Sequence, residues 1–294
     1  MRVLLFLIAA CSAPAPVGPA GAGSVHWPPI VDSHVHLSFD PVAAQLAAHG
    51  VLAAVDLAAP ERALRDPAAI TVLRAGPMLT HPGGYPLDAW GKDGYGIGCA
   101  DERCVRDTID RLAREGAKVI KVALDGDGLE PELLPAAVAA AHAHHLKVAV
   151  HALTDASAAV AAAAGVDVLA HTPVEPLADA TAAAWKGRAV ISTLAAFGGS
   201  DAAIANLRKL RAAGATVLYG TDLGNLRVDG PSGDELDLLR AAGLDDAAIA
   251  AAMTTEPAAY WGIAFDPKTT YLVLDGDPRQ DARVLLHARV ITSK

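Results

Sequence analysis

Short apolar runs alternate with longer Ala-rich segments along the chain from residue 30 onward. The apolar runs are rich in β-branched residues and have the length of buried strands, whereas the Ala-rich segments have the length of helices. This alternation predicts βα units and a parallel sheet. Eight strands are expected, the number that closes a (β/α)8 TIM barrel: Ile30–His36, Val51–Leu57, Ile70–Leu79, Val119–Leu124, Val148–His151, Val166–His171, Ala189–Leu194 and Val217–Asp222.

Helices are expected between these strands and after the last of them. The clearest are Leu133–His144, Ala156–Ala164, Asp234–Ala242 and Asp245–Thr255. Gly116, Gly165 and Gly214 each precede a predicted strand, where they suit the C-terminal caps of helices. The connection from Thr80 to about Asp101 is unusually long, and we expect it to cover the barrel mouth as a substrate-binding loop.

The two ends of the chain depart from this pattern. Residues 1–11 resemble a bacterial export signal, with Arg2 before an apolar run too short to span a bilayer. Ile8-Ala9-Ala10-Cys11 resembles a lipobox, in which Cys11 carries the lipid; an ordinary signal peptide cut nearby is the alternative. Residues 12–25 form a Pro/Gly/Ala tether, residues 26–264 the barrel, and residues 265–294 a reduced C-terminal β segment. We therefore expect an exported protein, either periplasmic or anchored to the membrane as a lipoprotein.

Composition limits the partners that this chain can have. Its 294 residues are 52% hydrophobic, which is enough for one large domain with a full core. There are 24 basic and 33 acidic residues, and the absence of a basic block argues against nucleic acid and leaves a small-molecule substrate. Oligomeric state is left open. If Cys11 carries lipid, Cys99 and Cys104 remain, and they either form a disulfide or stay as two thiols.

Six ionisable residues lie at or near the C-terminal ends of predicted strands, where active sites of this barrel form. They are His34, His36, Lys121, His151, His171 and Asp222. Residues two apart on a strand face the same side, so the two histidines of the first strand can bind one ion together. Imidazole and carboxylate ligands suit Zn²⁺ or a similar divalent metal. Each residue alone has an ordinary structural explanation, but their ordered placement favours a single metal site.

The chain resembles the amidohydrolase superfamily, and in particular its imidazolonepropionase-related and prolidase-like members with two metals. The matching segments are Val31-Asp32-Ser33-His34-Val35-His36, Gly116-Ala117-Lys118-Val119-Ile120-Lys121, Val150-His151-Ala152, Val168-Leu169-Ala170-His171-Thr172-Pro173, Gly220-Thr221-Asp222 and the tail from Tyr271 to Pro278.

This resemblance implies two divalent metal ions, with zinc as the first candidate. One would be held by His34, His36 and Asp222, the other by His151 and His171, and a carboxylated Lys121 would bridge them. It implies hydrolysis of a C–N bond in an amide, cyclic amide or dipeptide by a metal-bridging hydroxide, with Asp222 as general base and then acid.

The chain also departs from the family's pattern. Gly83-Gly84-Tyr85 stands where the family carries Gly-Gly-His, and Asn225 and Arg227 stand near the place of a missing histidine. We expect substrate contacts from Tyr85, His81, Asn225 and Arg227, with Trp90 and Tyr95 extending an aromatic wall. Two alternatives remain at this point: a phosphotriesterase or lactonase on the same metals, and a non-catalytic exported binding protein.

Overall fold

The computed structural model describes residues 24–293. The expected signal peptide, the lipid-bearing Cys11 and nearly all of the tether therefore lie outside the described residues. Within residues 24–293, none of the helices combines the length and the apolar character needed to cross a membrane.

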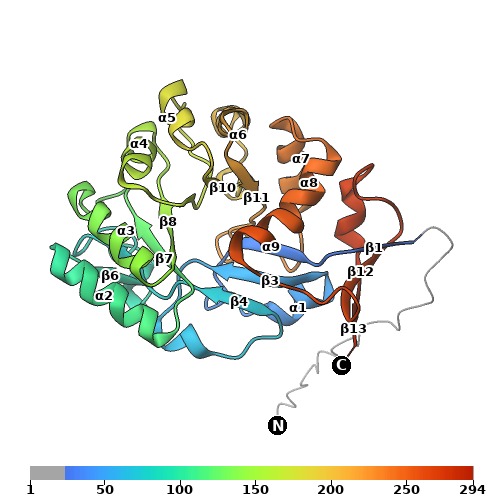
Figure 1. Ribbon diagram of the computed structural model, residues 1–294, viewed down its shortest axis with the longest axis horizontal. Coiled ribbons are helices and arrows are strands. Elements are labelled where there is room, and N and C mark those ends of the chain that lie inside the picture. Colours follow the sequence, from blue (N-terminus) through green and yellow to red (C-terminus); the bar gives the residue numbers. More distant parts are fainter. Residues whose placement is uncertain (1–23, 294) are drawn as a thin grey trace, which may run out of the picture.

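Parallel strands occupy the centre of the molecule, and helices surround them (Figure 1). One parallel sheet has the order β2-β3-β4, with strands Ile30–Val35, Val51–Asp56 and Thr71–Arg74. A second parallel sheet has the order β11-β10-β9-β8-β7-β5-β6. Its strands, in chain order, are β5 (Met78–Thr80), β6 (Gly96–Gly98), β7 (Val119–Ala123), β8 (Lys147–His151), β9 (Val168–Leu169), β10 (Ala189–Ile191) and β11 (Thr216–Leu218).

The expected mixed α/β class and parallel strands are thus confirmed, and the seven-stranded sheet fits a TIM-like barrel. The strand ladders within residues 24–293 do not join into one closed ring. Single hydrogen bonds nevertheless connect the first strand to the segment after the last one. The Asp222 N–H donates to the His34 carbonyl at 2.8 Å, and the His36 N–H donates to the Leu223 carbonyl at 2.7 Å.

The helices lie outside the strands (Figure 1). They are α1 (Ala43–Ala48), α2 (Glu102–Glu115), α3 (Leu134–Ala143), α4 (Asp155–Ala164), α5 (Asp179–Ala184), α6 (Asp201–Ala213), α7 (Gly233–Ala241), α8 (Asp246–Met253) and α9 (Thr255–Trp261). Short 3-10 helices span Glu61–Arg65, Gly91–Asp93, Pro131–Leu133, Ala195–Phe197 and Ala282–His287. Gly116, Gly165 and Gly214 cap α2, α4 and α6 in the left-handed conformation, as expected.

Several predicted boundaries were wrong. The third strand is two strands, because Gly76 adopts φ 73° and Pro77 has no N–H to donate; β4 pairs with β3, and β5 pairs with β7. The segment predicted as one helix from Asp245 breaks at Thr254, where φ is −130°, and α9 continues beyond it. β2, β9 and β11 end before His36, His171 and Asp222, so these three residues lie in the loops just after their strands.

A small antiparallel sheet of order β1-β12-β13 lies beside the barrel strands (Figure 1). Its strands are Val25–Trp27, Thr270–Leu274 and Arg289–Thr292. The C-terminal β segment therefore does not stand alone, because Val25–Trp27, which the sequence assigned to the tether and the barrel, pairs with Leu272–Leu274. The exposed His26 lies between the partly buried Val25 and Trp27, an alternation that is typical of an edge strand.

Side chains alternate across β7 and fix the direction of its lysine. Val119 packs with the residues that fill the space inside the strands, whereas Ile120 and Val122 pack between the strands and the helices. Lys121 shares the inward direction of Val119, because residues two apart on a strand face the same side. Sequence alternation thus places a lysine amine at the centre of the fold.

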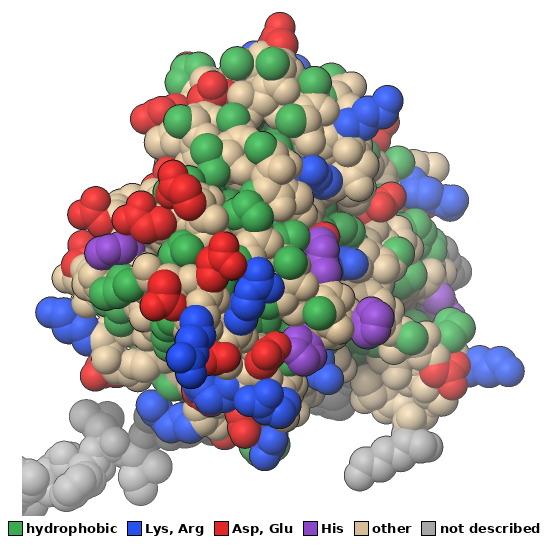
Figure 2. Space-filling view, turned by 60° about the vertical axis from the view of Figure 1, so that its left-hand side comes forward, with side chains coloured by type: hydrophobic (Ala, Val, Ile, Leu, Met, Phe, Trp, Pro, Cys, Tyr) green, Lys and Arg blue, Asp and Glu red, His purple; other side chains and the backbone are tan. Residues whose placement is uncertain are grey.

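Charge on the surface is mixed in sign. On the face that carries the left-hand helices of Figure 1, acidic and basic side chains are interspersed (Figure 2). No continuous basic surface is visible there among the described residues, in agreement with the net charge of −9. No nucleic-acid partner is evident from this distribution.

Candidate metal centre

His34, His36 and Asp222 form a buried cluster of possible metal ligands. Their ligand atoms all lie within 4.8 Å of one another. Asp222 Oδ1 lies 3.4 Å from His34 Nε2 and 3.1 Å from His36 Nε2. His34 lies in β2, His36 follows the end of β2, and Asp222 lies in the segment after β11. Hydrogen bonds between these two segments bring the three side chains together.

Hydrogen bonds orient the ring of His34 and fix the strand that carries it. His34 Nδ1 lies 2.8 Å from the Ala170 carbonyl, which can only accept, so Nδ1 carries the proton and Nε2 presents a lone pair. Asp32 accepts hydrogen bonds from the His34 N–H at 3.1 Å and from the Thr221 hydroxyl at 2.6 Å, and so joins β2 to the segment that carries Asp222. Gly220 allows this approach, because a Cβ there would lie 2.4 Å from Ile191 Cγ2.

His171 and His151 continue the cluster. The His171 ring centroid lies 4.5 Å from that of His34 and 5.0 Å from that of His151. His171 Nδ1 contacts Thr193 Oγ1 at 3.0 Å, which leaves Nε2 available to an ion. Both rings are buried, and burial followed by the charges of neighbouring groups lowers the pKa of His171 well below its usual value and that of His151 to about 3. The two rings are therefore neutral, as metal ligands must be.

Lys121 lies within the same cluster. Its side chain is 1% exposed, and its Nζ has no hydrogen-bond partner among the described residues. Burial lowers the pKa of Lys121 from 10.5 to about 7, although the charge of Asp222 opposes the shift. A large fraction of this amine is therefore neutral near pH 7, which is the form that reacts with CO₂ to give a carbamate.

Asp222 is held in its charged form. Burial alone would raise its pKa, but His34 and His36 lower it to about 2. Its backbone adopts φ 55°, which is rare for a residue with a side chain, and Asn225 Nδ2 lies 3.2 Å from each carboxylate oxygen. Asn225 thus helps to hold the Asp222 carboxylate against His34 and His36.

The donor set fits the two divalent ions that the resemblance implies. His34 Nε2 and Lys121 Nζ are buried without a hydrogen-bond partner in the described chain, which is costly unless another group satisfies them. Four imidazoles and one carboxylate match the nitrogen and oxygen ligands of zinc and similar ions. The structure therefore brings all six predicted ligands into one buried cluster.

A cleft of about 340 Å³ opens beside this cluster. It is lined by Tyr85, His151, Leu153, Ala196, Phe197, Asp222 and Asn225. The Tyr85 ring lies 4.9 Å from His151, and the Phe197 ring lies 4.9 Å from His171. Trp90 donates a hydrogen bond from Nε1 to the Tyr85 hydroxyl at 3.2 Å and lies 5.7 Å from His36. Aromatic walls thus flank the candidate ligands on two sides.

The predicted substrate contacts divide into two groups. Tyr85 and Asn225 line the cleft. His81 instead lies 3.8 Å from Glu130 at a different depression, and Arg227 is exposed and does not line the cleft. Phe197 was not predicted; the only signal for it was an aromatic residue before Gly198-Gly199 in the segment that follows a strand.

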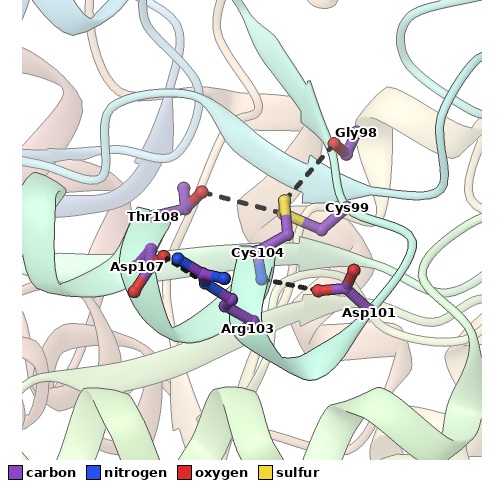
Figure 3. Close-up of a disulfide and its surroundings, with 7 residues drawn as sticks. All are labelled: Gly98, Cys99, Asp101, Arg103, Cys104, Asp107 and Thr108. Carbon is purple, nitrogen blue, oxygen red and sulfur yellow. Dashed lines mark hydrogen bonds and ion pairs between the residues drawn. A yellow bond between two sulfur atoms is a disulfide. The ribbon is translucent and has the colours of Figure 1, made fainter.

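Cys99 and Cys104 form a disulfide at the start of α2 (Figure 3). Their Cα atoms lie 5.4 Å apart. Asp101 caps the helix between them, because its side chain accepts a hydrogen bond from the Cys104 N–H at 2.8 Å. The disulfide closes the end of the long loop that contains Tyr85 and Trp90.

No family model and no curated protein matches the chain. Solved structures do. An amidohydrolase superposes with a TM-score of 0.74 at 21% identity, over 95% of this chain and 91% of that one. A Xaa-Pro dipeptidase with methionine in its active site gives 0.75 at 18% identity, over 90% and 84%. An ochratoxinase from A. niger gives 0.71 at 19% identity, over 88% and 79%. The chain therefore shares its fold with these three hydrolase structures.

Proposed function

We propose that this protein is a metal-dependent amidohydrolase that cleaves a C–N bond in a small amide, cyclic amide or dipeptide. The observation that carries the proposal is the buried cluster of His34, His36, Lys121, His151, His171 and Asp222, in which His34 Nε2 and Lys121 Nζ lack a hydrogen-bond partner among the described residues. The names of the similar structures, which include a dipeptidase and an amidohydrolase, support the same reaction class.

The residues divide into two ligand groups in this proposal. His34, His36 and Asp222 hold one ion, and His151 and His171 hold the second. Lys121 joins them as a carbamate, because a free ammonium has no lone pair and is repelled by cations. Two divalent ions at this place would supply Lewis acidity and lower the pKa of a water molecule.

Asp222 moves the proton in the proposed reaction. Its carboxylate is ionised at neutral pH and faces both the ligand cluster and the cleft. It accepts a proton from the attacking water and delivers it to the leaving nitrogen, so the amine departs neutral. Asn225 keeps both carboxylate oxygens in place during this transfer.

The cleft favours a substrate with an apolar or aromatic group. The Tyr85 ring lies beside His151, and the Phe197 ring lies beside His171. Burial raises the pKa of Tyr85, so its hydroxyl stays protonated. A flat apolar group between these rings would leave the scissile bond beside Asp222.

Elemental analysis and a substrate screen test this proposal together. Protein purified without chelator should contain about two divalent ions per chain and hydrolyse N-acyl amino acids or dipeptides. Asp222→Asn should lose at least roughly 100-fold in kcat, whereas Asp234→Asn, on the exposed side of α7, should not. Activity confined to lactones or phosphotriesters would reassign the reaction. A metal content near zero would favour the alternative of a non-catalytic binding protein.

A further inference from the structure

A second cavity lies near the barrel mouth and shares no lining residue with the cleft at the metal centre. Its volume is about 490 Å³. It lies where the split third strand leaves β4 paired only with β3, and segments after β2 and β3 close its sides. Arg74, the last residue of β4 before the break at Gly76 and Pro77, is part of its lining.

Two carboxylates line this cavity, of which Asp56 is buried and Asp66 is exposed. The Asp56 side chain is fully buried in the cavity wall, and neither of its carboxylate oxygens makes a hydrogen bond within the described chain. Burial raises the pKa of Asp56 to about 6, although the charges of His36 and Arg74 and the backbone N–H groups of Ala58 and Leu37 oppose the rise. A buried carboxylate without a partner is costly, so the site needs another group to satisfy it.

Strand alternation explains why Asp56 faces this cavity and not the metal centre. Val55 and Leu57 pack with the residues inside the strands, so Asp56 between them points outward. Arg74 on β4 is the register partner of Asp56 on β3 and points to the same side. The two side chains nevertheless form no ion pair within residues 24–293.

Two guanidinium groups provide the cationic side. Arg62 and Arg74 both line the cavity, and neither has an ion-pair or side-chain hydrogen-bond partner among the residues that the structure describes. The rest of the lining includes Ser38, Tyr95 and apolar residues such as Leu37, Ala44 and Pro60. The cavity thus presents unpaired charges of both signs together with an apolar surface.

We propose that this cavity binds a free α-amino acid as its zwitterion. The ammonium pairs with the Asp56 carboxylate, the carboxylate of the ligand pairs with Arg74 and Arg62, and the apolar lining accepts an aliphatic side chain. A purely anionic ligand would leave Asp56 unsatisfied, and a simple amine would leave both arginines unsatisfied. This inference concerns binding alone and stands independently of the proposed hydrolysis.

Calorimetric titration of the full, metal-loaded protein tests the proposal. The probes are L-leucine, N-acetyl-L-leucine, which lacks the ammonium, and L-leucinamide, which lacks the carboxylate. L-leucine should bind, and each truncated probe should bind at least about 10-fold more weakly, because a charged hydrogen-bond partner is lost. Equal affinity for N-acetyl-L-leucine would overturn the proposal.

Variants assign the binding to this cavity. Asp56→Asn and Arg74→Gln should each weaken L-leucine binding roughly 10- to 100-fold without changing the metal content. Asp107→Asn and Arg103→Gln are the matched controls, because this exposed pair lies on α2, and they should leave binding unchanged. Binding that survives both cavity variants but disappears on metal removal would place leucine at the metal centre and overturn the proposal.

A crystal structure with L-leucine decides the matter if a variant fails to fold. Density for leucine between Asp56 and Arg74 supports the proposal. An empty cavity in which Arg74 has turned to pair with Asp56 overturns it, as does density for leucine at the metal centre alone.

Discussion

Replacing Lys121 by methionine in the metal-free protein should increase stability. The lowering of its pKa from 10.5 to about 7 corresponds to about 5 kcal/mol of destabilisation when the lysine is protonated in both states. The unfolded chain holds this proton up to about pH 10.5 and the folded protein only to about pH 7. The cost is therefore present in full below pH 7, falls to about 2 kcal/mol at pH 9, and vanishes above pH 10.5. Methionine has similar length and no charge, so it avoids this cost.

The same substitution should be harmful once metal is present. Lys121→Met and Lys121→Ala remove the proposed bridge and should lose most activity and at least one ion, while the four histidines remain. Lys121→Arg should fail as well, because a guanidinium stays charged and cannot form a carbamate. A short carboxylic acid added to Lys121→Ala should restore part of the activity by placing a carboxylate between the ions.

Urea unfolding with a chelator, at pH 7 and pH 9, measures the first effect, and elemental analysis measures the second. Lys118→Met is the matched control, because Lys118 is exposed just before β7 and should change stability by less than about 0.5 kcal/mol. If metal-free Lys121→Met is no more stable than the native protein at pH 7, the cost of burying the charged lysine is refuted. If Lys121→Ala keeps both ions, the bridging role is refuted.

Three further predictions follow from the site and the chain's start. Tyr85→Ala should raise KM roughly 10-fold or reorder substrates with metal content unchanged, because the aromatic wall is lost; loss of metal instead would mean that the loop supports the ligands. Metal-free protein stripped of CO₂ should regain activity with bicarbonate and metal at a rate that rises through pH 7 and then levels as Lys121 becomes neutral, whereas a rise continuing to pH 10 would indicate an ordinary lysine. Mass spectrometry of native membranes should find lipid on Cys11 and no alkylatable thiol at Cys99 or Cys104; an unmodified N-terminus beyond Cys11 would count against the lipid anchor, and two free thiols would count against the disulfide.

The convergence of the six candidate metal ligands could be predicted from sequence because their positions depend on one rule. Parallel strands in this fold end at the same face, so polar residues at those ends converge whatever the exact register. That is why His36, His171 and Asp222 join the cluster even though each lies beyond the end of its strand. The error in strand boundaries was one to four residues and did not move the side chains away from the mouth.

Contacts made by loops could not be predicted in this way. Phe197 reaches His171 from a 3-10 turn, and His81 turns to Glu130 although it lies in the loop that carries Tyr85. Loop direction depends on packing against distant segments, which one sequence does not encode locally. The break at Gly76-Pro77 did carry a local signal, since both residues interrupt strands, but the apolar residues around it favoured one continuous strand.

Asp56 shows that position at a strand end is not sufficient and that side-chain direction decides its role. It ends β3 at the same face as the metal ligands, and by position alone it would join them. The apolar neighbours Val55 and Leu57 point inward, so alternation turns the carboxylate away from the metal centre and toward the second cavity. Lys121 has the opposite direction, because its outward neighbours Ile120 and Val122 leave the inward place to the amine. Side chains alternate between the two faces of a strand. This alternation therefore places Lys121 in the candidate metal centre and Asp56 in the proposed amino-acid site.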